Sequence, residues 1–406
     1  MSYFLVLKTG HDNKVIHAAI SLAWAVLALA LFLLWQFLTV HYNRAGNWTA
    51  LFLTGQESAI PPDLAPGTYK FPGVGYDGEM YRYVAHDIFA RRGYVQYVDS
   101  PAQRYRRILV PTLAYLLVAG HQPWIDASYI AVIAIFVLLG AYWLSRLAVL
   151  AGRHPAWALA FLAVPATLIS MDRMTVDVAL VAFTVAFAFY WRTGAWVKVF
   201  IVLTLACLVR ETGVVLAGAC CLLELFSRRF ARAALWASTA LPILVWYLIV
   251  RRTLPQHTNI IVPHWFTIGF PPGIFETLLQ PPRYPLSPVL ESIARWGDVI
   301  SLTAILLASI VAILLLRSRP LNPMVIAAIL FAVMVFALTN PRYWYDINGY
   351  ARVVSPLLLL VGLGTVAGEG RVRWWIGLVP AILVDLRLSM EFAGAAGGIV
   401  RGLLGR

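Results

Sequence analysis

Acidic and basic side chains gather in the longest hydrophilic stretch of this 406-residue chain. Asp77 and Glu79 lie two positions apart, and after a turn come Arg104, Arg106 and Arg107. A carboxylate within hydrogen-bond reach of a hydroxyl can take its proton, and a guanidinium binds phosphate through two parallel hydrogen bonds. The pairing therefore predicts a site that activates a hydroxyl beside a lipid-linked phosphate, with the two acids catalytic and the three arginines binding substrate.

Both groups also have a simpler interpretation. The acids lie in a segment bounded by prolines, and the alternative is that they are ordinary solvated loop charges. For the arginines, the alternative is a basic stripe against anionic lipid head groups. Against the first alternative, Gly75 and Gly78 bracket Asp77 with flexible backbone. Aromatic side chains surround it, namely Tyr76, Tyr81 and Tyr83. Such a setting suits a carboxylate beside a sugar and predicts Asp77 as the general base for an acceptor hydroxyl.

The composition fixes the class of protein. Hydrophobic residues make up 61% of the chain and charged residues only 13%, and apolar runs of about 20 residues recur along it. The net charge of +13 would favour nucleic acid in a soluble protein, but Lys and Arg concentrate between the apolar runs, where they orient a membrane protein. We therefore expect an all-α polytopic membrane protein in contact with membrane lipids, without nucleic acid as a partner.

The sequence gives no sign of a metal centre or cofactor. Cys207, Cys220 and Cys221 all lie in apolar segments, with neither a disulfide framework nor the spacing of a zinc site. Walker A, HExxH and clustered His and Cys patterns are absent from the sequence. We expect no cofactor and no metal ligand set, while a divalent metal beside the acids stays open.

The basic residues predict the topology. Lys8 and Lys14 precede the apolar run Val15–Val40, which is too long for a signal-peptide core and indicates an uncleaved first helix with a cytoplasmic N-terminus. Further basic clusters follow after every two apolar runs, which gives about eleven spans. These clusters are Arg146 and Arg153; Arg192 and Lys198; Arg228, Arg229 and Arg232; Arg317 and Arg319; and Arg371 and Arg373.

One apolar segment is too short to cross the membrane. Ile108–Gly120 has about half the length that a span needs, and counting it as a crossing would reverse every later basic loop. We assign residues 105–120 to an interfacial helix within a first periplasmic loop at 41–124. A second long periplasmic loop follows at 252–298, and residues 1–406 form a single integral membrane domain.

Most carboxylates fall on the predicted outer side. An ionisable group near the hydrocarbon costs about 2.5 to 3.5 kcal/mol at a helix centre, so such groups tend to line a polar cavity or pair with one another. We expect further substrate-binding residues at the span ends and in the outer loops: Asp172, Asp177, Arg210, Glu211, His264, Asp346 and Arg352. The alternatives are that the acids cap helix ends, that Arg210 forms an ion pair, and that His264 is structural.

Several short stretches carry a family resemblance. They are Tyr76–Gly78, Arg104–Pro111, Met171–Phe183, Arg210–Gly213 and Asp346–Leu360. The chain thereby resembles the GT-C superfamily of membrane glycosyltransferases over residues 15–390, closest to bacterial multi-spanning proteins of cell-surface glycopolymer formation. The resemblance implies a polyprenyl-phosphate sugar donor, transfer on the outer face, and a catalytic carboxylate that maps onto Asp77 with Glu79 beside it. Many members carry two adjacent acids there, whereas Gly78 separates them here.

The expected function is that of a glycosyltransferase in the bacterial inner membrane, with its active face periplasmic. It would transfer a sugar from a polyprenyl-phosphate donor to a cell-surface glycan or lipid acceptor. One alternative is a transporter or flippase for lipid-linked sugars, which typically has internal repeats and broken midplane helices. The other is a noncatalytic component of polysaccharide assembly, in which the loop acids would be dispensable. After Arg387 we expect only a Gly-rich tail.

Overall fold

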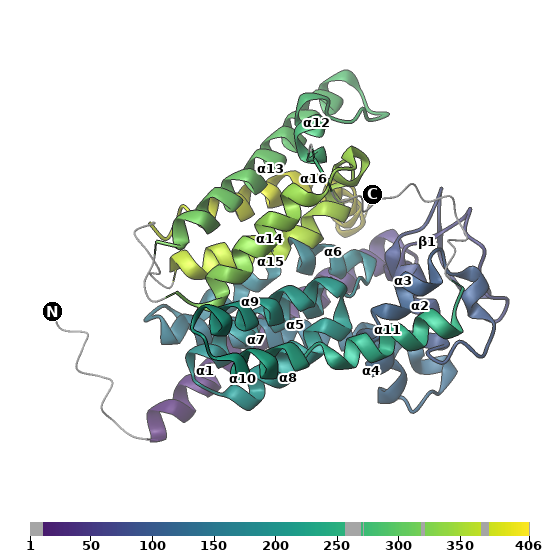
Figure 1. Cartoon of the computed structure of the whole chain (residues 1–406). Coiled ribbons are helices and arrows are strands. Elements are labelled where there is room, and N and C mark those ends of the chain that lie inside the picture. Colours follow the sequence, from purple (N-terminus) through teal and green to yellow (C-terminus); the bar gives the residue numbers. More distant parts are fainter. Residues whose placement is uncertain (1–10, 256–268, 271, 318–320, 367–372, 406) are drawn as a thin grey trace.

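The computed structural model describes residues 11–255, 269–270, 272–317, 321–366 and 373–405, and most of them lie in helices (Figure 1). The α-helices are α1 (His11–Asn43), α2 (Asp77–His86), α3 (Pro101–Arg106), α4 (Leu109–Leu117), α5 (Ile125–Leu150), α6 (Pro165–Arg173), α7 (Asp177–Arg192), α8 (Trp196–Val209), α9 (Val214–Phe226), α10 (Phe230–Ser238), α11 (Leu241–Thr253), α12 (Gly273–Leu279), α13 (Pro288–Leu315), α14 (Pro323–Ala337), α15 (Ile347–Val366) and α16 (Val379–Leu403). The 3-10 helices are η1 (Trp48–Phe52), η2 (Tyr94–Tyr97), η3 (Gln122–Trp124), η4 (Pro155–Ala163), η5 (Glu211–Gly213) and η6 (Pro341–Trp344). The strands β1 (Thr54–Gly55) and β2 (Lys70–Phe71) pair in parallel, with Thr54 opposite Lys70. The all-α prediction is confirmed.

Several helices are long and apolar enough to cross a membrane. Within the described residues there are 4 such segments, Val15–Asn43, Gln122–Leu150, Pro288–Leu315 and Ile347–Val366, or up to 6 if two bent helix pairs each count as one span. A span needs about 20 apolar residues because the hydrocarbon core is about 30 Å thick. The prediction of several membrane-spanning helices is confirmed, whereas the predicted number of about eleven spans stays a prediction.

The first helix shows a face suited to lipid. Leu27, Leu31 and Leu34 are exposed and recur at the three- and four-residue spacing of one helix face. Ala28 and Phe32 are buried where α1 packs against α5 and η4. An exposed apolar stripe of this length would be unfavourable in water, so it is explained by contact with lipid chains.

The centre of the molecule is α7, which packs against α5, α8 and α15. Every side chain from Asp177 to Phe189 is buried. Small residues such as Ala182 and Ala186 let neighbouring helices approach, while Phe183 and Phe187 fill the space between them. Because the helix is buried all round, the charged residue at its first position must find a partner inside the protein.

The segment at 41–124 is folded rather than loop-like. Figure 1 shows α2, α3, α4 and the short strands gathered at one end of the helical bundle. The prediction of one continuous interfacial helix at 105–120 is wrong: the segment is divided, since α3 ends at Arg106 and α4 begins at Leu109. Pro111 explains the break: its ring would clash with the carbonyl of Arg107 in a continuous helix, whereas Pro is tolerated in a first turn.

The prediction of a Gly-rich tail after Arg387 is also wrong, since α16 continues to Leu403. The glycines of this segment serve packing. A Cβ atom on Gly398 would lie 1.8 Å from Asn43 Oδ1, and one on Gly402 would lie 2.2 Å from the Tyr42 ring. Small residues therefore let α16 lie close against the end of α1, as they do at other helix contacts in membranes.

The glycines beside Asp77 likewise permit close approach. A Cβ atom on Gly78 would lie 2.1 Å from the carbonyl oxygen of Arg173, and one on Gly75 would lie 1.8 Å from Glu79 Oε2. The start of α2 is thus pressed against the end of α6. The sequence interpretation of these glycines as flexible backbone is replaced by a packing role that fixes the position of Asp77.

We predict that Gly78→Ala destabilises the protein by about 1 to 3 kcal/mol, because the added methyl group overlaps backbone rather than a movable side chain. Gly218→Ala in α9 is the matched control, since its added methyl group would meet nothing within 4 Å. Thermal unfolding of the purified protein in detergent measures both. Equal unfolding temperatures for the two variants would contradict the close packing of α2 on α6.

Candidate functional site

The first residue of α2, Asp77, is held by two arginines from distant segments. Arg104 Nη2 of α3 lies 2.8 Å from Asp77 Oδ1, and Arg352 Nη2 of α15 lies 2.5 Å from Asp77 Oδ2. The helix start favours a negative charge there, because the first-turn N–H groups carry partial positive charge. The Asp77 side chain retains 15% exposure, so a substrate group can reach it.

Both arginines are shared with a second acid. Arg104 donates two hydrogen bonds to Asp99, of 2.8 and 2.5 Å. Arg352 Nη1 makes a longer contact of 3.5 Å with Asp177 Oδ2 at the start of α7. Asp177 in turn pairs with Arg210 at the end of α8, and this pair is almost fully buried. Alternating charges thus join five helices of the chain, α2, α3, α7, α8 and α15.

A fourth arginine lies beside this row. Arg107 Nε donates to Glu211 Oε2 at 3.0 Å, and Arg107 Nη1 donates to the Tyr81 hydroxyl at 2.7 Å. The Tyr81 ring also lies 5.4 Å from the guanidinium carbon of Arg104. We call the whole set the Asp77 cluster: Asp77, Asp99, Asp177, Glu211, Arg104, Arg107, Arg210 and Arg352. Its four carboxylates balance its four guanidinium groups.

The balance of charge keeps Asp77 ionised. Burial alone would raise its pKa, but Arg104 and Arg352 outweigh that effect and hold the pKa of Asp77 well below its usual range. Arg107 acts in the same direction on the pKa of Glu211, again against the effect of burial. In this arrangement Asp77 accepts hydrogen bonds but is a weak base, because both of its oxygens are engaged by guanidinium groups.

Tyr76 connects the Asp77 cluster to its surroundings. Its ring centroid lies 5.1 Å from the guanidinium carbon of Arg352 and 5.5 Å from that of Arg173. Its hydroxyl donates to Asp346 Oδ2 at 3.2 Å. One aromatic side chain therefore contacts a cluster arginine, a second arginine outside the cluster, and the carboxylate that precedes α15.

The structure separates Glu79 and Arg106 from the Asp77 cluster. Glu79 is fully buried, accepts from the Tyr83 hydroxyl at 2.8 Å and from the Gly55 N–H at 3.3 Å, and makes no ion pair with any described residue. Burial raises its pKa. Arg106 lies over the Tyr247 ring of α11, at 4.2 Å from the centroid. Glu79 thus links α2 to the backbone of β1, and Arg106 links α3 to α11.

Of the remaining predicted site residues, Asp172 also lies apart from the cluster. Its Oδ1 accepts from Trp35 Nε1 of α1 at 2.8 Å. Asp346 reaches the cluster only through Tyr76. His264 lies outside the residues that the structure describes.

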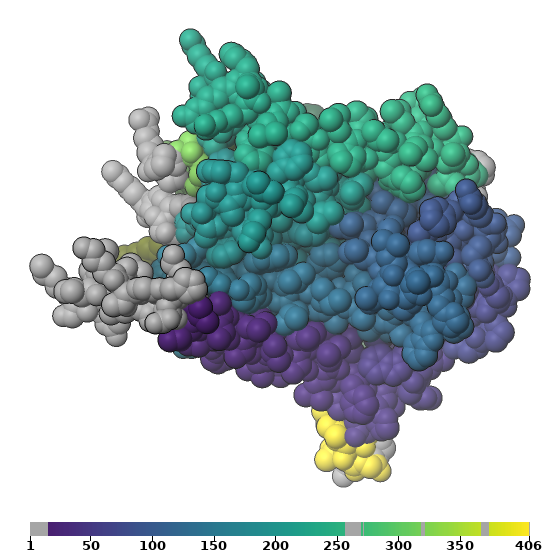
Figure 2. Space-filling view, turned by 90° about the horizontal axis from the view of Figure 1, so that it is seen from below, coloured from purple at the N-terminus to yellow at the C-terminus, as the bar shows by residue number. Residues whose placement is uncertain are grey.

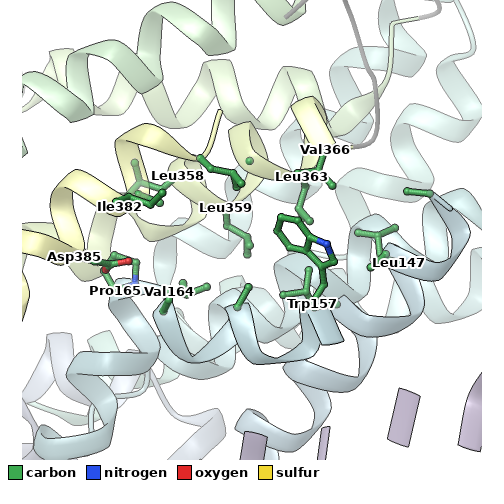
Figure 3. A pocket seen from close by; sticks show the side chains of 18 of the residues that line it. Leu147, Trp157, Val164, Pro165, Leu358, Leu359, Leu363, Val366, Ile382 and Asp385 are labelled. Carbon is green, nitrogen blue, oxygen red and sulfur yellow. The ribbon is translucent and has the colours of Figure 1, made fainter. Parts of the chain in front are cut away.

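The described part of the chain holds no group of three or more His, Cys, Asp or Glu side chains placed to share a metal ion. An apolar cavity of about 270 Å³ lies elsewhere, between α5, η4, α15 and α16 (Figure 3). Its lining contains no residue of the Asp77 cluster. One carboxylate, that of Asp385, reaches it beside Val164 and Pro165, and its Oδ1 is buried without a hydrogen-bond partner.

Comparison of the chain with models of protein families, with curated proteins and with solved structures finds no match. The chemistry of the site itself therefore indicates the function. The GT-C resemblance of the short stretches stays a prediction.

The predicted site lacks Asp99 and Arg173, and it includes Tyr81 only as an aromatic neighbour of Asp77. Asp99 is visible as an outer-side acid five positions before Arg104, the spacing that lets the pair form across the start of α3. Arg173 directly follows Asp172 at the end of an apolar run, where a charged side chain is costly and therefore informative. Tyr81 lies four positions after Asp77, which places the two on one face of α2.

We predict that Asp177→Asn destabilises the protein by about 3 to 5 kcal/mol, because it leaves Arg210 as a buried charge without its main partner. The double variant Asp177→Asn/Arg210→Gln should regain most of that loss, since both charges are gone. Thermal unfolding in detergent measures the difference.

The control for this pair is Arg92→Gln, which breaks the exposed pair of Arg92 with Asp63. An exposed pair is worth about 0 to 1 kcal/mol. If Asp177→Asn unfolds no earlier than Arg92→Gln, the buried charge at Arg210 has found another partner and the row of alternating charges is not what holds α7 to α8.

Proposed function

We propose that the protein is a membrane-embedded glycosyltransferase and that the Asp77 cluster is its reaction centre. It transfers a sugar from a polyprenyl-phosphate donor to a cell-surface glycan or lipid acceptor, on the periplasmic side of a bacterial inner membrane that the chain crosses about eleven times. The observation that supports this most is a reachable, ionised carboxylate between two guanidinium groups at the end of an apolar helical bundle. Hydroxyl activation beside a phosphate needs these two chemical groups together.

In the proposed reaction the bond between the sugar carbon and the phosphate oxygen breaks, and the acceptor oxygen forms the new bond to that carbon. The phosphate leaves with the bonding electron pair, and the acceptor proton passes to Asp77. A guanidinium group facing the departing phosphate stabilises its developing charge. No step needs a further reactant.

Arg352 is the cluster arginine best suited to that role. Arg104 is fixed by two short bonds to Asp99, whereas the second contact of Arg352, to Asp177, is long at 3.5 Å. The Nε of Arg352 is buried without a hydrogen-bond partner. A donor phosphate can therefore draw Arg352 away from Asp77. This move frees Oδ2 and raises the pKa of Asp77, which becomes a stronger base only when the donor is bound.

One observation favours transport of a lipid-linked sugar as a second candidate. The pair of η4 and α6 is bent by 61°, and the break at Val164 adjoins the apolar cavity that contains Asp385 (Figure 3). Broken helices beside a charged group are typical of transporters. Apart from Asp385 and Arg192, however, the lining of this cavity is uncharged, which is a poor match to a sugar phosphate. A transporter would give no sugar transfer in the assay below, and its transport of the lipid-linked sugar would tolerate Asp77→Asn and fail on Asp385→Asn.

We predict that Asp77→Asn lowers sugar transfer about a hundredfold or more while the protein still inserts and accumulates, because the change removes the charge and keeps the shape. Glu79→Gln is the matched control, since Glu79 is buried away from the arginines, and it should cost far less. Radiolabelled transfer by purified protein with candidate polyprenyl-phosphate sugars is the measurement. Near-normal product formation by Asp77→Asn would exclude Asp77 as the base.

We predict that Arg352→Lys weakens donor use about tenfold, since Lys keeps the charge but loses the planar fork that can hold phosphate and carboxylate together. Arg106→Lys tests the alternative of general electrostatics, because Arg106 faces Tyr247 instead of the cluster. The dependence of the rate on donor concentration is compared for both variants. Unchanged donor use by Arg352→Lys would move the phosphate away from Arg352.

A further inference from the structure

A second cavity, this one polar, lies beside Arg173, whose guanidinium group also contacts the Tyr76 ring. It has a volume of about 390 Å³ and lies between the end of α1, η1, the end of α6 and the last turns of α16. Figure 2 shows the C-terminal end of the chain emerging beside this end of α1. We call it the η1 pocket. Its charged lining consists of Arg44, Asp172, Arg173, Glu391 and Arg401.

The two carboxylates of the η1 pocket are engaged by groups outside it. Asp172 Oδ1 accepts from Trp35 Nε1 at 2.8 Å, and Glu391 Oε1 accepts from Arg387 Nη1 at 2.9 Å. Neither Trp35 nor Arg387 lines the pocket. Each acid therefore has a donor of its own, which reduces the repulsion that it would exert on an anion in the pocket.

The three arginines of the pocket have no such partners. Among the described residues, none of Arg44, Arg173 and Arg401 forms an ion pair with a carboxylate. Arg44 lies over the Phe71 ring at 4.4 Å, and Arg173 lies beside the Tyr76 ring. Stacking uses the face of a guanidinium and leaves most of its N–H edge available to a ligand, although Arg44 Nη1 makes one long contact of 3.4 Å with the Asn43 carbonyl oxygen. The pocket thus contrasts with the Asp77 cluster, where every arginine is paired.

Two buried polar atoms in the wall of the pocket lack a partner. They are the hydroxyl oxygen of Thr39, a residue only 4% exposed, and the Nε of Arg173. A buried donor without an acceptor costs about 1 to 3 kcal/mol. Both residues line the cavity, so an anion that draws their side chains toward it would supply the missing acceptor.

We propose that the η1 pocket binds a phosphate group, held by Arg44, Arg173 and Arg401 with the Thr39 hydroxyl as a further donor. A phosphate offers several acceptor oxygens and up to two negative charges, which suits three guanidinium groups in a confined space. The pocket is one aromatic side chain away from Arg352, through Tyr76. We assign the phosphate to the acceptor substrate, an assignment that rests on the proposed function, whereas phosphate binding itself does not.

The test is direct binding to the full-length protein in detergent. The probes are dioctanoyl phosphatidic acid, which carries a phosphate without a sugar or a prenyl chain, and dioctanoylglycerol as its uncharged counterpart. Calorimetry should detect the phosphatidic acid only. The triple variant Arg44→Gln/Arg173→Gln/Arg401→Gln should weaken binding at least tenfold, and Arg401→Gln alone should weaken it measurably. Arg401 is exposed at the end of α16, so its loss does not threaten folding.

Two control variants locate the bound phosphate. Arg92→Gln changes an arginine of the 41–124 segment, which also contains Arg44, but Arg92 pairs with Asp63 outside the pocket. This variant should bind the phosphatidic acid as the unmodified protein does. Arg352→Gln should also retain binding, because Arg352 belongs to the Asp77 cluster and does not line the pocket. Binding that survives the triple variant, binding that is lost with Arg352→Gln, or equal binding of dioctanoylglycerol would each overturn the proposal.

Inorganic phosphate distinguishes the source of the group. If it displaces the phosphatidic acid, the pocket accepts phosphate on a soluble saccharide as well as on a lipid; if it does not, the pocket takes a lipid head group, and both results uphold phosphate binding. The failure of this proposal is separable from that of the proposed function. Transfer activity without phosphate binding in the η1 pocket would contradict only the pocket proposal. Phosphate binding without any transfer activity would contradict only the proposed glycosyltransferase function.

Discussion

Asp77 is held by two guanidinium groups at the end of an apolar bundle, and the arrangement of the surrounding elements depends on this double ion pair. Through Arg104 it fixes α3 to α2, and through Arg352 it fixes both to α15. Charges in a region of low dielectric interact strongly, but each must be paired because desolvation is costly. The row therefore continues to Asp177 and Arg210, and it ends only where every charge has a neighbour of opposite sign.

A cluster with four acids and four arginines is stable without a ligand, and this sets the condition for chemistry. A carboxylate that pairs with two arginines is too weak a base to take a hydroxyl proton readily. In the proposed reaction its pairing must loosen when the donor binds, and the contacts of Arg352 are unequal enough to allow this: one short contact with Asp77, one long contact with Asp177, and an unpaired Nε. In the proposed reaction, the same arrangement would keep the base inactive until the donor phosphate is bound.

The sequence predicts the helical class and much of the cluster, because the cost of charges near hydrocarbon forces the acids and arginines at span ends to meet. The prediction fails where the geometry of a helix determines which of two nearby charged residues faces the cluster. Once α2 begins at Asp77, a residue two positions later cannot face the same way, so Glu79 turns into the loop region. Arg104 and Arg107 are three apart and point to one side, whereas Arg106 points to α11. Periodicity over such short helices is not visible in a segment rich in Gly and Pro.

Two electrostatic environments thus lie back to back at one end of the bundle. The Asp77 cluster is balanced, while the η1 pocket has guanidinium groups without paired carboxylates. Tyr76 separates them, contacts Arg173 on one side and Arg352 on the other, and donates to Asp346. The two environments therefore meet at one aromatic ring, and the guanidinium groups on its two sides differ in their partners: Arg352 pairs with Asp77, whereas Arg173 forms no ion pair with a described residue.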